Sequence, residues 1–394
     1  MTAPSLPDAD ALAHSAHLRA LIQEQIIAAG GSVPFWKFME LALYAPGLGY
    51  YSAGAIKFGR GGDFTTAPEL SPLYSACVAD ALAPVLQQLG PDALFVEVGG
   101  GSGAFAETAL SKLLANDALP ARYAILEPSA DLRERQRERL QQRLPPLLFE
   151  LVEWLDGPIQ HAWNGVLFAN EVIDALPTPR FAIRDGEVFE EHVALDGEGR
   201  FRRTDRPADP ILAAAVRHVE RQLPEPFEEG YRSELLAQLP YWLQAVIGGM
   251  ADGAMLFVDY GYARGEYYQP QRRDGTLRAF RQHQLVADVF AFPGLQDITA
   301  SVDFTALAEA GSGAGFDFTG YCSQSSFLLG NRLQDNLALA ESRAADEVAR
   351  HALRTQVKQL TLPSEMGERF QAIGFQRGVE FGAAFLAGDL SHRL

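Results

Sequence analysis

The chain has few cysteines, few basic residues and no long apolar run. Two cysteines, Cys77 and Cys322, are too few for a disulfide framework, and no Cys-x-x-Cys pair is present for metal or redox chemistry. Lys and Arg total 33 against 50 Asp and Glu, a formal net charge of −17, whereas nucleic-acid-binding proteins usually carry a basic face. No apolar run is long enough to predict a membrane span. We therefore expect no metal site and neither a nucleic-acid nor a membrane partner.

The N-terminal segment also lacks targeting features. It has no cationic head followed by an apolar core, and it carries Asp8 and Asp10, so it is typical neither of a secretory signal nor of an Arg-rich transit peptide. The scarcity of cysteine suits a reducing compartment. These features predict a cytoplasmic protein, and the length of 394 residues predicts one large domain with insertions or two domains.

Glycine, by contrast, is concentrated at one point. In LFVEVGGGSGAFAETAL (94–110), four of the five residues from 99 to 103 are glycine, between an apolar run and a helical pattern. Glycine lets the backbone turn sharply and lets a ligand approach the main chain closely. In an open parallel sheet, ligands bind beyond the carboxyl ends of the strands. The cluster therefore predicts a turn that holds a nucleotide-like ligand.

Apolar runs alternate with helical patterns from residue 93 onward. The expected strands are 93–99, 122–128, 147–155, 164–172 and 252–261, and the expected helices include 103–115 and 129–144. Near-continuous apolar strands between helices predict an α/β fold with a parallel sheet covered on both faces. Asp185-Gly186 and Asp196-Gly197 are hairpin signals, so we expect an antiparallel insertion between the fourth and fifth of these strands.

Acidic residues accompany the glycine turn. The run E-x-G-x-G-x-G (97–103) matches motif I of the class I S-adenosylmethionine methyltransferases, whereas residues 99–104 also satisfy the dinucleotide fingerprint G-x-G-x-x-A. Glu127 ends the second expected strand, where a carboxylate can hold both ribose hydroxyls of a nucleoside. Both families use such an acid, so these residues alone leave the two ligands open.

A larger set of motifs resembles the MidA family of methyltransferases, which includes a mitochondrial arginine methyltransferase. The motifs are GRGGDFTTAPELSP (59–72), EVGGGSGAF (97–105), NEVIDALP (170–177), DYG (259–261), GTLRAF with a following His283 (275–283) and PGLQDITASVDF (293–304). The resemblance runs from about residue 20 to 380. It implies a Rossmann-like class I fold with a mostly parallel seven-stranded sheet, S-adenosyl-L-methionine as cofactor, and a protein arginine as methyl acceptor.

The resemblance and the strand ends together give a candidate cofactor site. Its expected members are Glu97, Gly99, Gly101, Ser102, Gly103, Glu127, Pro128, Trp154, Leu155 and Asn170, with Thr65, Thr66, Pro68 and Glu69 from a segment that we expect to fold over the cofactor as a lid. Two alternatives stay open. Trp154 is either an adenine neighbour or part of the core, and Thr66 is either a cofactor contact or a helix N-cap.

The acceptor side is expected to be acidic. An arginine side chain stays protonated up to a pKa above 12, so carboxylates are needed to orient its guanidinium. Glu171 is the first candidate, and Asp174 is either a second carboxylate or the cap of the next turn. Asp259 and Tyr260 are expected to contact the substrate, Tyr260 by stacking on the cation. His283 is a proton acceptor or a structural residue.

The chain is thus expected to have four segments. They are an N-terminal helical segment with a glycine-rich lid (1–90), the first part of the cofactor-binding core (91–177), an inserted acceptor-side α+β subdomain (178–250) and the second part of the core (251–394). The expected partner is a protein with an exposed arginine, and a homodimer is one option for the assembly. The alternatives are a non-catalytic assembly factor that binds S-adenosylmethionine and an NAD-dependent oxidoreductase on a similar sheet.

Overall fold

The computed structural model describes residues 6–53, 65–282 and 284–394. The chain divides into two compact units, each built from three stretches of sequence. Unit 1 comprises Met1–Phe64, Ile173–Gln238 and Tyr262–Asp303, and unit 2 comprises Thr65–Val172, Leu239–Gly261 and Phe304–Leu394. Within the described ranges, no helix combines the length and the apolar character that crossing a membrane requires.

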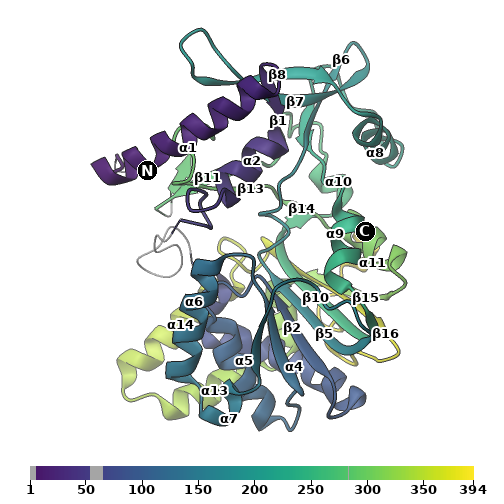
Figure 1. Cartoon of the computed structure of the whole chain (residues 1–394). Coiled ribbons are helices and arrows are strands. Elements are labelled where there is room, and N and C mark those ends of the chain that lie inside the picture. Colours follow the sequence, from purple (N-terminus) through teal and green to yellow (C-terminus); the bar gives the residue numbers. More distant parts are fainter. Residues whose placement is uncertain (1–5, 54–64, 283) are drawn as a thin grey trace. The chain divides into compact units, whose positions relative to one another are not determined.

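Unit 2 contains the larger sheet, in which seven strands follow the order β15-β16-β10-β5-β2-β3-β4. Figure 1 labels β15, β16, β10, β5 and β2 of this sheet. These strands are β2 (Leu94–Val98), β3 (Arg122–Leu126), β4 (Val152–Leu155), β5 (Trp163–Asn170), β10 (Met250–Tyr262), β15 (Asp317–Ser323) and β16 (Phe370–Arg377). The five strands from β10 to β4 run parallel, while β16 is antiparallel to both β10 and β15. The mostly parallel α/β sheet predicted from the sequence is confirmed.

Helices pack on this sheet, and its central strands are therefore buried. On β5 every residue from 165 to 169 is buried. Val166 and Phe168 belong to a core cluster with side chains of α4 and α5, while α11 packs against α9 and against β15 and β16. The helices of unit 2 are α3 (Ala67–Leu70), α4 (Pro72–Leu89), α5 (Ala104–Ala115), α6 (Ala130–Arg143), α7 (Pro146–Phe149), α9 (Leu239–Ile247), α11 (Phe304–Gly313), α12 (Gln324–Gly330), α13 (Leu333–Arg343), α14 (Glu347–Thr361) and a 3-10 turn (Ser391–Arg393).

One expected strand is shorter than predicted. The run 147–155 was expected to be extended throughout, but its first half is the short helix α7 and only Val152–Leu155 forms β4. The cause is the Pro145-Pro146 pair, because proline is favoured at the first helical position, where its missing N–H is not needed. Ser32 begins the strand β1, and the helix after it has Pro34 at its N-cap.

Unit 1 contains two antiparallel sheets. The first has the order β1-β7-β6-β9, with β8 paired to β7, and the second has the order β12-β11-β13. Its elements are α1 (Ala9–Ala28), β1 (Ser32–Pro34), α2 (Phe35–Tyr44), β6 (Arg180–Arg184), β7 (Glu187–Leu195), β8 (Phe201–Pro207), α8 (Pro210–Glu220), β9 (Arg232–Glu234), α10 (Arg264–Tyr267), β11 (Arg278–Arg281), β12 (Gln284–Val286), β13 (Asp297–Thr299) and β14 (Val302–Asp303). The predicted turn at Asp185-Gly186 joins β6 to β7, with φ of 51° and 74° as a two-residue hairpin requires.

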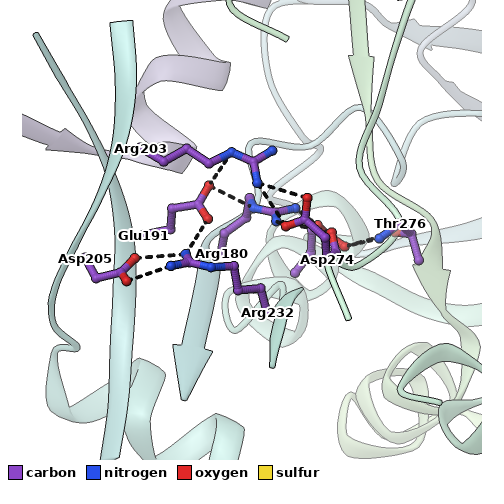
Figure 2. A network of polar contacts seen from close by, with 8 residues as sticks. Arg180, Glu191, Arg203, Asp205, Arg232, Asp274 and Thr276 are labelled. Carbon is purple, nitrogen blue, oxygen red and sulfur yellow. Dashed lines mark hydrogen bonds and ion pairs between the residues drawn. The ribbon is translucent and has the colours of Figure 1, made fainter. Parts of the chain in front are cut away.

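A buried network of ion pairs connects three strands of unit 1 to the loop before β11 (Figure 2). The Arg180 side chain is fully buried, pairs with the buried carboxylates of Glu191 (3.1 Å) and Glu234, and also reaches Asp274 at 2.7 Å. Thr276 donates its backbone N–H to Glu234 at 2.7 Å. The loop that leads into β11 is thereby fastened to β6, β7 and β9.

Candidate functional site

The glycine turn follows the carboxyl end of β2 in unit 2. Gly99, Gly101 and Gly103 have φ of 68°, 53° and 83°, a left-handed region that side chains with a Cβ rarely adopt. A Cβ on Gly99 would lie 2.8 Å from Cγ2 of Val172, too close for any real contact. Gly103 is the N-cap residue of α5. The turn therefore depends on glycine for its backbone conformation and for its space.

Glu97 is buried in β2, two residues before the first glycine. Glu97 is only 4% exposed, and the hydroxyl of Tyr123 donates to its Oε2 at 2.7 Å. Burial raises the pKa of the Glu97 carboxyl to about 7, against the effect of the Tyr123 hydrogen bond, which lowers it. This acid is therefore poised to change its charge near neutral pH.

Glu127 lies directly after β3 and is also buried. Its Oε1 accepts the backbone N–H of Ser129 at 3.0 Å, and its Oε2 accepts a hydrogen bond from Nε2 of Gln136 at 3.3 Å. Both oxygens thus have a donor that fixes the plane of the carboxylate. Pro128, the next residue, is exposed.

Gln136 on α6 is a residue of this site that the sequence did not single out. Its Nε2 also donates to the carbonyl oxygen of Gly101 at 2.9 Å, and its Oε1 accepts from Nε1 of Trp154 at 2.9 Å. Trp154 and Leu155 are half-buried in β4, and the guanidinium of Arg137 lies 4.6 Å from a ring centroid of Trp154. The sequence gives no signal for Gln136, because α6 consists mostly of polar residues and nothing in their spacing distinguishes this one.

Helix α3 is fastened to the glycine turn by Arg139. One guanidinium nitrogen of Arg139 donates both to Glu69 of α3 at 3.1 Å and to the hydroxyl of Ser102 at 2.9 Å, and another donates to Glu107 at 2.8 Å. Burial raises the pKa of the Glu69 carboxyl, and Arg139 opposes that rise. These contacts bring two predicted site residues, Glu69 and Ser102, to the same cation.

The other residues predicted near Glu69 lie at the start of α3. Thr66 is the N-cap residue of this helix by position but makes no side-chain cap hydrogen bond, Pro68 lies in its first turn, and Thr65 precedes it. The predicted lid spans residues 62–69, and its first three residues, 62–64, lie outside the described residues.

Glu171 follows β5 with an unusual backbone. Its φ of 54° is left-handed although it is not glycine, and its N–H donates to the carbonyl of Val258 at 2.9 Å. Its Oε1 accepts the N–H of Ala67 at 3.3 Å and the side-chain amide of Asn170 at 3.1 Å. Asn170 in turn accepts a hydrogen bond from the hydroxyl of Tyr74. The carboxylate of Glu171 is therefore oriented by two donors at the carboxyl edge of the sheet.

Asp259 supports the same edge from β10. It is 1% exposed and accepts the N–H of Val172 at 3.2 Å and of Tyr260 at 2.9 Å. Burial raises the pKa of Tyr74 well above its usual value, and the nearby charges of Glu171 and Asp259 raise it further. The ring of Tyr260 lies 5.8 Å from that of Phe370.

Unit 2 thus holds the predicted site residues with two exceptions. Asp174 belongs to unit 1, where it is buried and its carbonyl accepts the N–H of Ala300 at 3.0 Å. His283 lies outside the described residues. Across the described part of the chain, no group of three or more His, Cys, Asp and Glu could hold a metal ion. A glycine turn flanked by two buried carboxylates is chemically suited to a nucleoside that carries a cationic amino group.

Three comparisons with known proteins agree with one another. A family profile described as "Putative S-adenosyl-L-methionine-dependent methyltransferase" matches residues 77–322. The mitochondrial protein arginine methyltransferase NDUFAF7 homolog of Drosophila melanogaster is 29% identical over 404 residues, which cover 95% of this chain and 88% of that protein; human NDUFAF7 is 26% identical, covering 87% and 80%. A crystal structure from Burkholderia thailandensis with S-adenosyl-homocysteine bound has a TM-score of 0.91 and 41% identity, covering 99% of this chain and all of the other.

These matches correct one expectation. The cytoplasmic location predicted from the cysteine content and the N-terminal segment is contradicted, because the curated relatives are named as mitochondrial proteins. The prediction failed because it relied on an absence: a segment that lacks targeting features carries no information on where related proteins reside.

Proposed function

Because the chain belongs to this family of S-adenosyl-L-methionine-dependent methyltransferases, we propose that it methylates an arginine side chain of a protein partner. Family membership makes S-adenosylmethionine the cofactor and removes the support for an NAD-dependent oxidoreductase. The arginine acceptor is supported by the relatives, which are named protein arginine methyltransferases. The net charge of −17 also suits a basic protein segment as substrate.

The cofactor is proposed to bind along the carboxyl ends of β2, β3 and β4. Glu127 would hold the ribose hydroxyls, because both its oxygens are kept in one plane by Ser129 and Gln136. Glu97 and the glycine turn would take the amino-acid end, and Trp154 would lie beside the adenine. The bound cofactor supplies an electrophilic methyl group on a sulfonium.

The acceptor is proposed to bind at Glu171, and the geometry of this residue carries the proposal. A left-handed backbone costs a non-glycine residue roughly 1–3 kcal/mol, and such strain is concentrated at functional sites. Here it sets a carboxylate, oriented by Ala67 and Asn170, at the strand end beside the cofactor turn. A carboxylate in that place would orient a guanidinium and favour the lone pair on one nitrogen. Asp259 would support Glu171 by holding the following turn, and Asp174 and His283 stay predictions.

The test uses an extract of cells that lack this protein, since the acceptor is unknown. The extract is incubated with tritiated S-adenosylmethionine and purified wild-type protein, Glu171→Gln or Glu150→Gln, and the labelled amino acids are separated after hydrolysis. We expect labelled methylarginine with the wild type and with the exposed control Glu150→Gln, and a loss of about 100-fold or more with Glu171→Gln.

Cofactor binding separates the alternatives. Glu171→Gln should bind S-adenosyl-homocysteine as the wild type does, because the proposed role of Glu171 is on the acceptor side. Label on an amino acid other than arginine would refute the acceptor. Normal cofactor binding with no labelled protein in any sample would favour a non-catalytic assembly factor.

A further inference from the structure

One side chain connects three parts of the cofactor site. Gln136 lies in the middle of α6 and is 0% exposed. Its amide nitrogen reaches the carbonyl of Gly101 and the carboxylate of Glu127, and its amide oxygen accepts from Trp154. A buried amide needs partners on both ends, and here all of these partners are themselves predicted cofactor residues.

The three partners come from three neighbouring strands. Gly101 lies in the turn after β2, Glu127 follows β3, and Trp154 is part of β4. The strands are hydrogen-bonded to one another, but the backbone ladder stops at Val98, Leu126 and Leu155. One further backbone bond runs from the N–H of Gly99 to the carbonyl of Leu126 at 2.9 Å, but it lies two residues before Gly101. The side chain of Gln136 therefore adds a link between Gly101 and Glu127 themselves.

We propose that Gln136 is a positioning residue for the cofactor: bonded to the Gly101 carbonyl and the Trp154 indole, it holds the Glu127 carboxylate in place for the ribose hydroxyls. This inference rests on the proposed placement of S-adenosylmethionine on these residues. In the free protein the ribose-binding carboxylate is already held, so less freedom is lost when the ligand binds.

The chemistry of the amide explains why glutamine occupies this position. An aliphatic side chain would leave the carbonyl of Gly101 and the indole N–H of Trp154 without their bonds. A glutamate would keep an acceptor for Trp154 but would place a second carboxylate against Glu127. The glutamine amide is neutral and carries both donors and an acceptor. It can therefore bond to Gly101, Glu127 and Trp154 without adding a charge beside Glu127.

The effect should depend on the ribose hydroxyls. Gln136→Met keeps the length of the side chain but removes the donors, so Glu127 loses the hydrogen bond from Gln136 and keeps the one from the Ser129 N–H. We expect the affinity for S-adenosyl-homocysteine to fall about tenfold, as the loss of one hydrogen bond to a charged group implies. The affinity for S-(2′,3′-dideoxyadenosyl)-homocysteine, which offers Glu127 no hydroxyl, should fall much less.

The experiment is calorimetric titration of both ligands into wild-type protein, Gln136→Met, Gln136→Glu and the control Gln142→Met, an exposed glutamine on the same helix. A fall of at least threefold in the ratio of the two affinities, in either Gln136 variant and not in the control, supports the proposal. An equal loss for both ligands would show a general packing effect and overturn it, as would no loss. If Gln136→Met does not fold, as circular dichroism would reveal, Gln136→Glu decides. Failure of the wild type to bind S-adenosyl-homocysteine would instead refute the cofactor placement itself.

Discussion

Replacing Glu97 with glutamine should change how protein stability and cofactor binding depend on pH. Burial raises the pKa of the Glu97 carboxyl from 4.5 to about 7. In the folded protein the acid therefore holds its proton between pH 4.5 and 7, whereas in the unfolded chain it has lost it. Folding takes up a proton in this range, so stability falls as pH rises through it, by about 3 kcal/mol in total. Glu97→Gln should abolish this decline and be the more stable protein above pH 7.

Ligand binding should show the opposite slope. If the ionised carboxylate receives the amino group of the cofactor, binding below pH 7 must first remove the proton from Glu97. About one molecule in eleven is ionised at pH 6 and about ten in eleven at pH 8, given a pKa of about 7. The affinity of the wild type relative to Glu97→Gln should therefore rise about tenfold between these two pH values.

The assay is titration of S-adenosyl-homocysteine into both proteins at pH 6, 7 and 8. Using the ratio of the two affinities cancels the titration of the ligand's own amino group. The reasoning is refuted by a ratio that stays constant over this range or that falls as the pH rises. Either outcome would mean that the Glu97 carboxyl is not the partner of the amino group, or that it does not titrate near 7.

Two further substitutions probe the surroundings of Glu97 and the core of unit 1. Tyr123→Phe removes the hydrogen bond that lowers the pKa of Glu97 and keeps the ring stacked on Phe95 at 4.7 Å, so the midpoint of the binding profile should move to higher pH in the same titration. Arg180→Met removes the cation that pairs with the fully buried Glu234, and one of the cations that pair with the fully buried Glu191, and should cost about 3–5 kcal/mol of stability in urea unfolding. The exposed Arg184→Met should cost less than about 1 kcal/mol, and equal losses in the two variants would contradict the burial argument.

The fold was largely predictable because short sequence patterns determine most of its strands, helices and turns. The alternation of apolar strands with helices from residue 93 predicted the parallel sheet, and Asp185-Gly186 predicted the hairpin between β6 and β7. The run 147–155 was misjudged because its apolar composition suits a strand and a buried helix equally, and the proline pair at its start decided between them.

The candidate site was predictable only in part. Glycines and acids at strand ends can be recognised from spacing, since a parallel sheet brings those ends to one edge. Gln136 was missed because its importance comes from partners on three other elements, and nothing in the polar helix 129–144 distinguishes it from its neighbours. The strained φ of Glu171 is likewise a property of the folded backbone and has no signature in the sequence.

The network around Arg180 shows the same limit in unit 1 (Figure 2). Its members lie far apart in the sequence, from Arg180 to Asp274, and each would be read as a solvated surface charge. A buried ion pair is weak grounds for stability, since the cost of removing the charges from water offsets their attraction. Its physical effect here is instead on geometry: Thr276 and Asp274 precede β11, and their bonds to Glu234 and Arg180 fix where that loop begins. Arg180→Met should therefore loosen the 274–276 loop as well as lower stability, so amide exchange at Thr276 should accelerate more than exchange in β7.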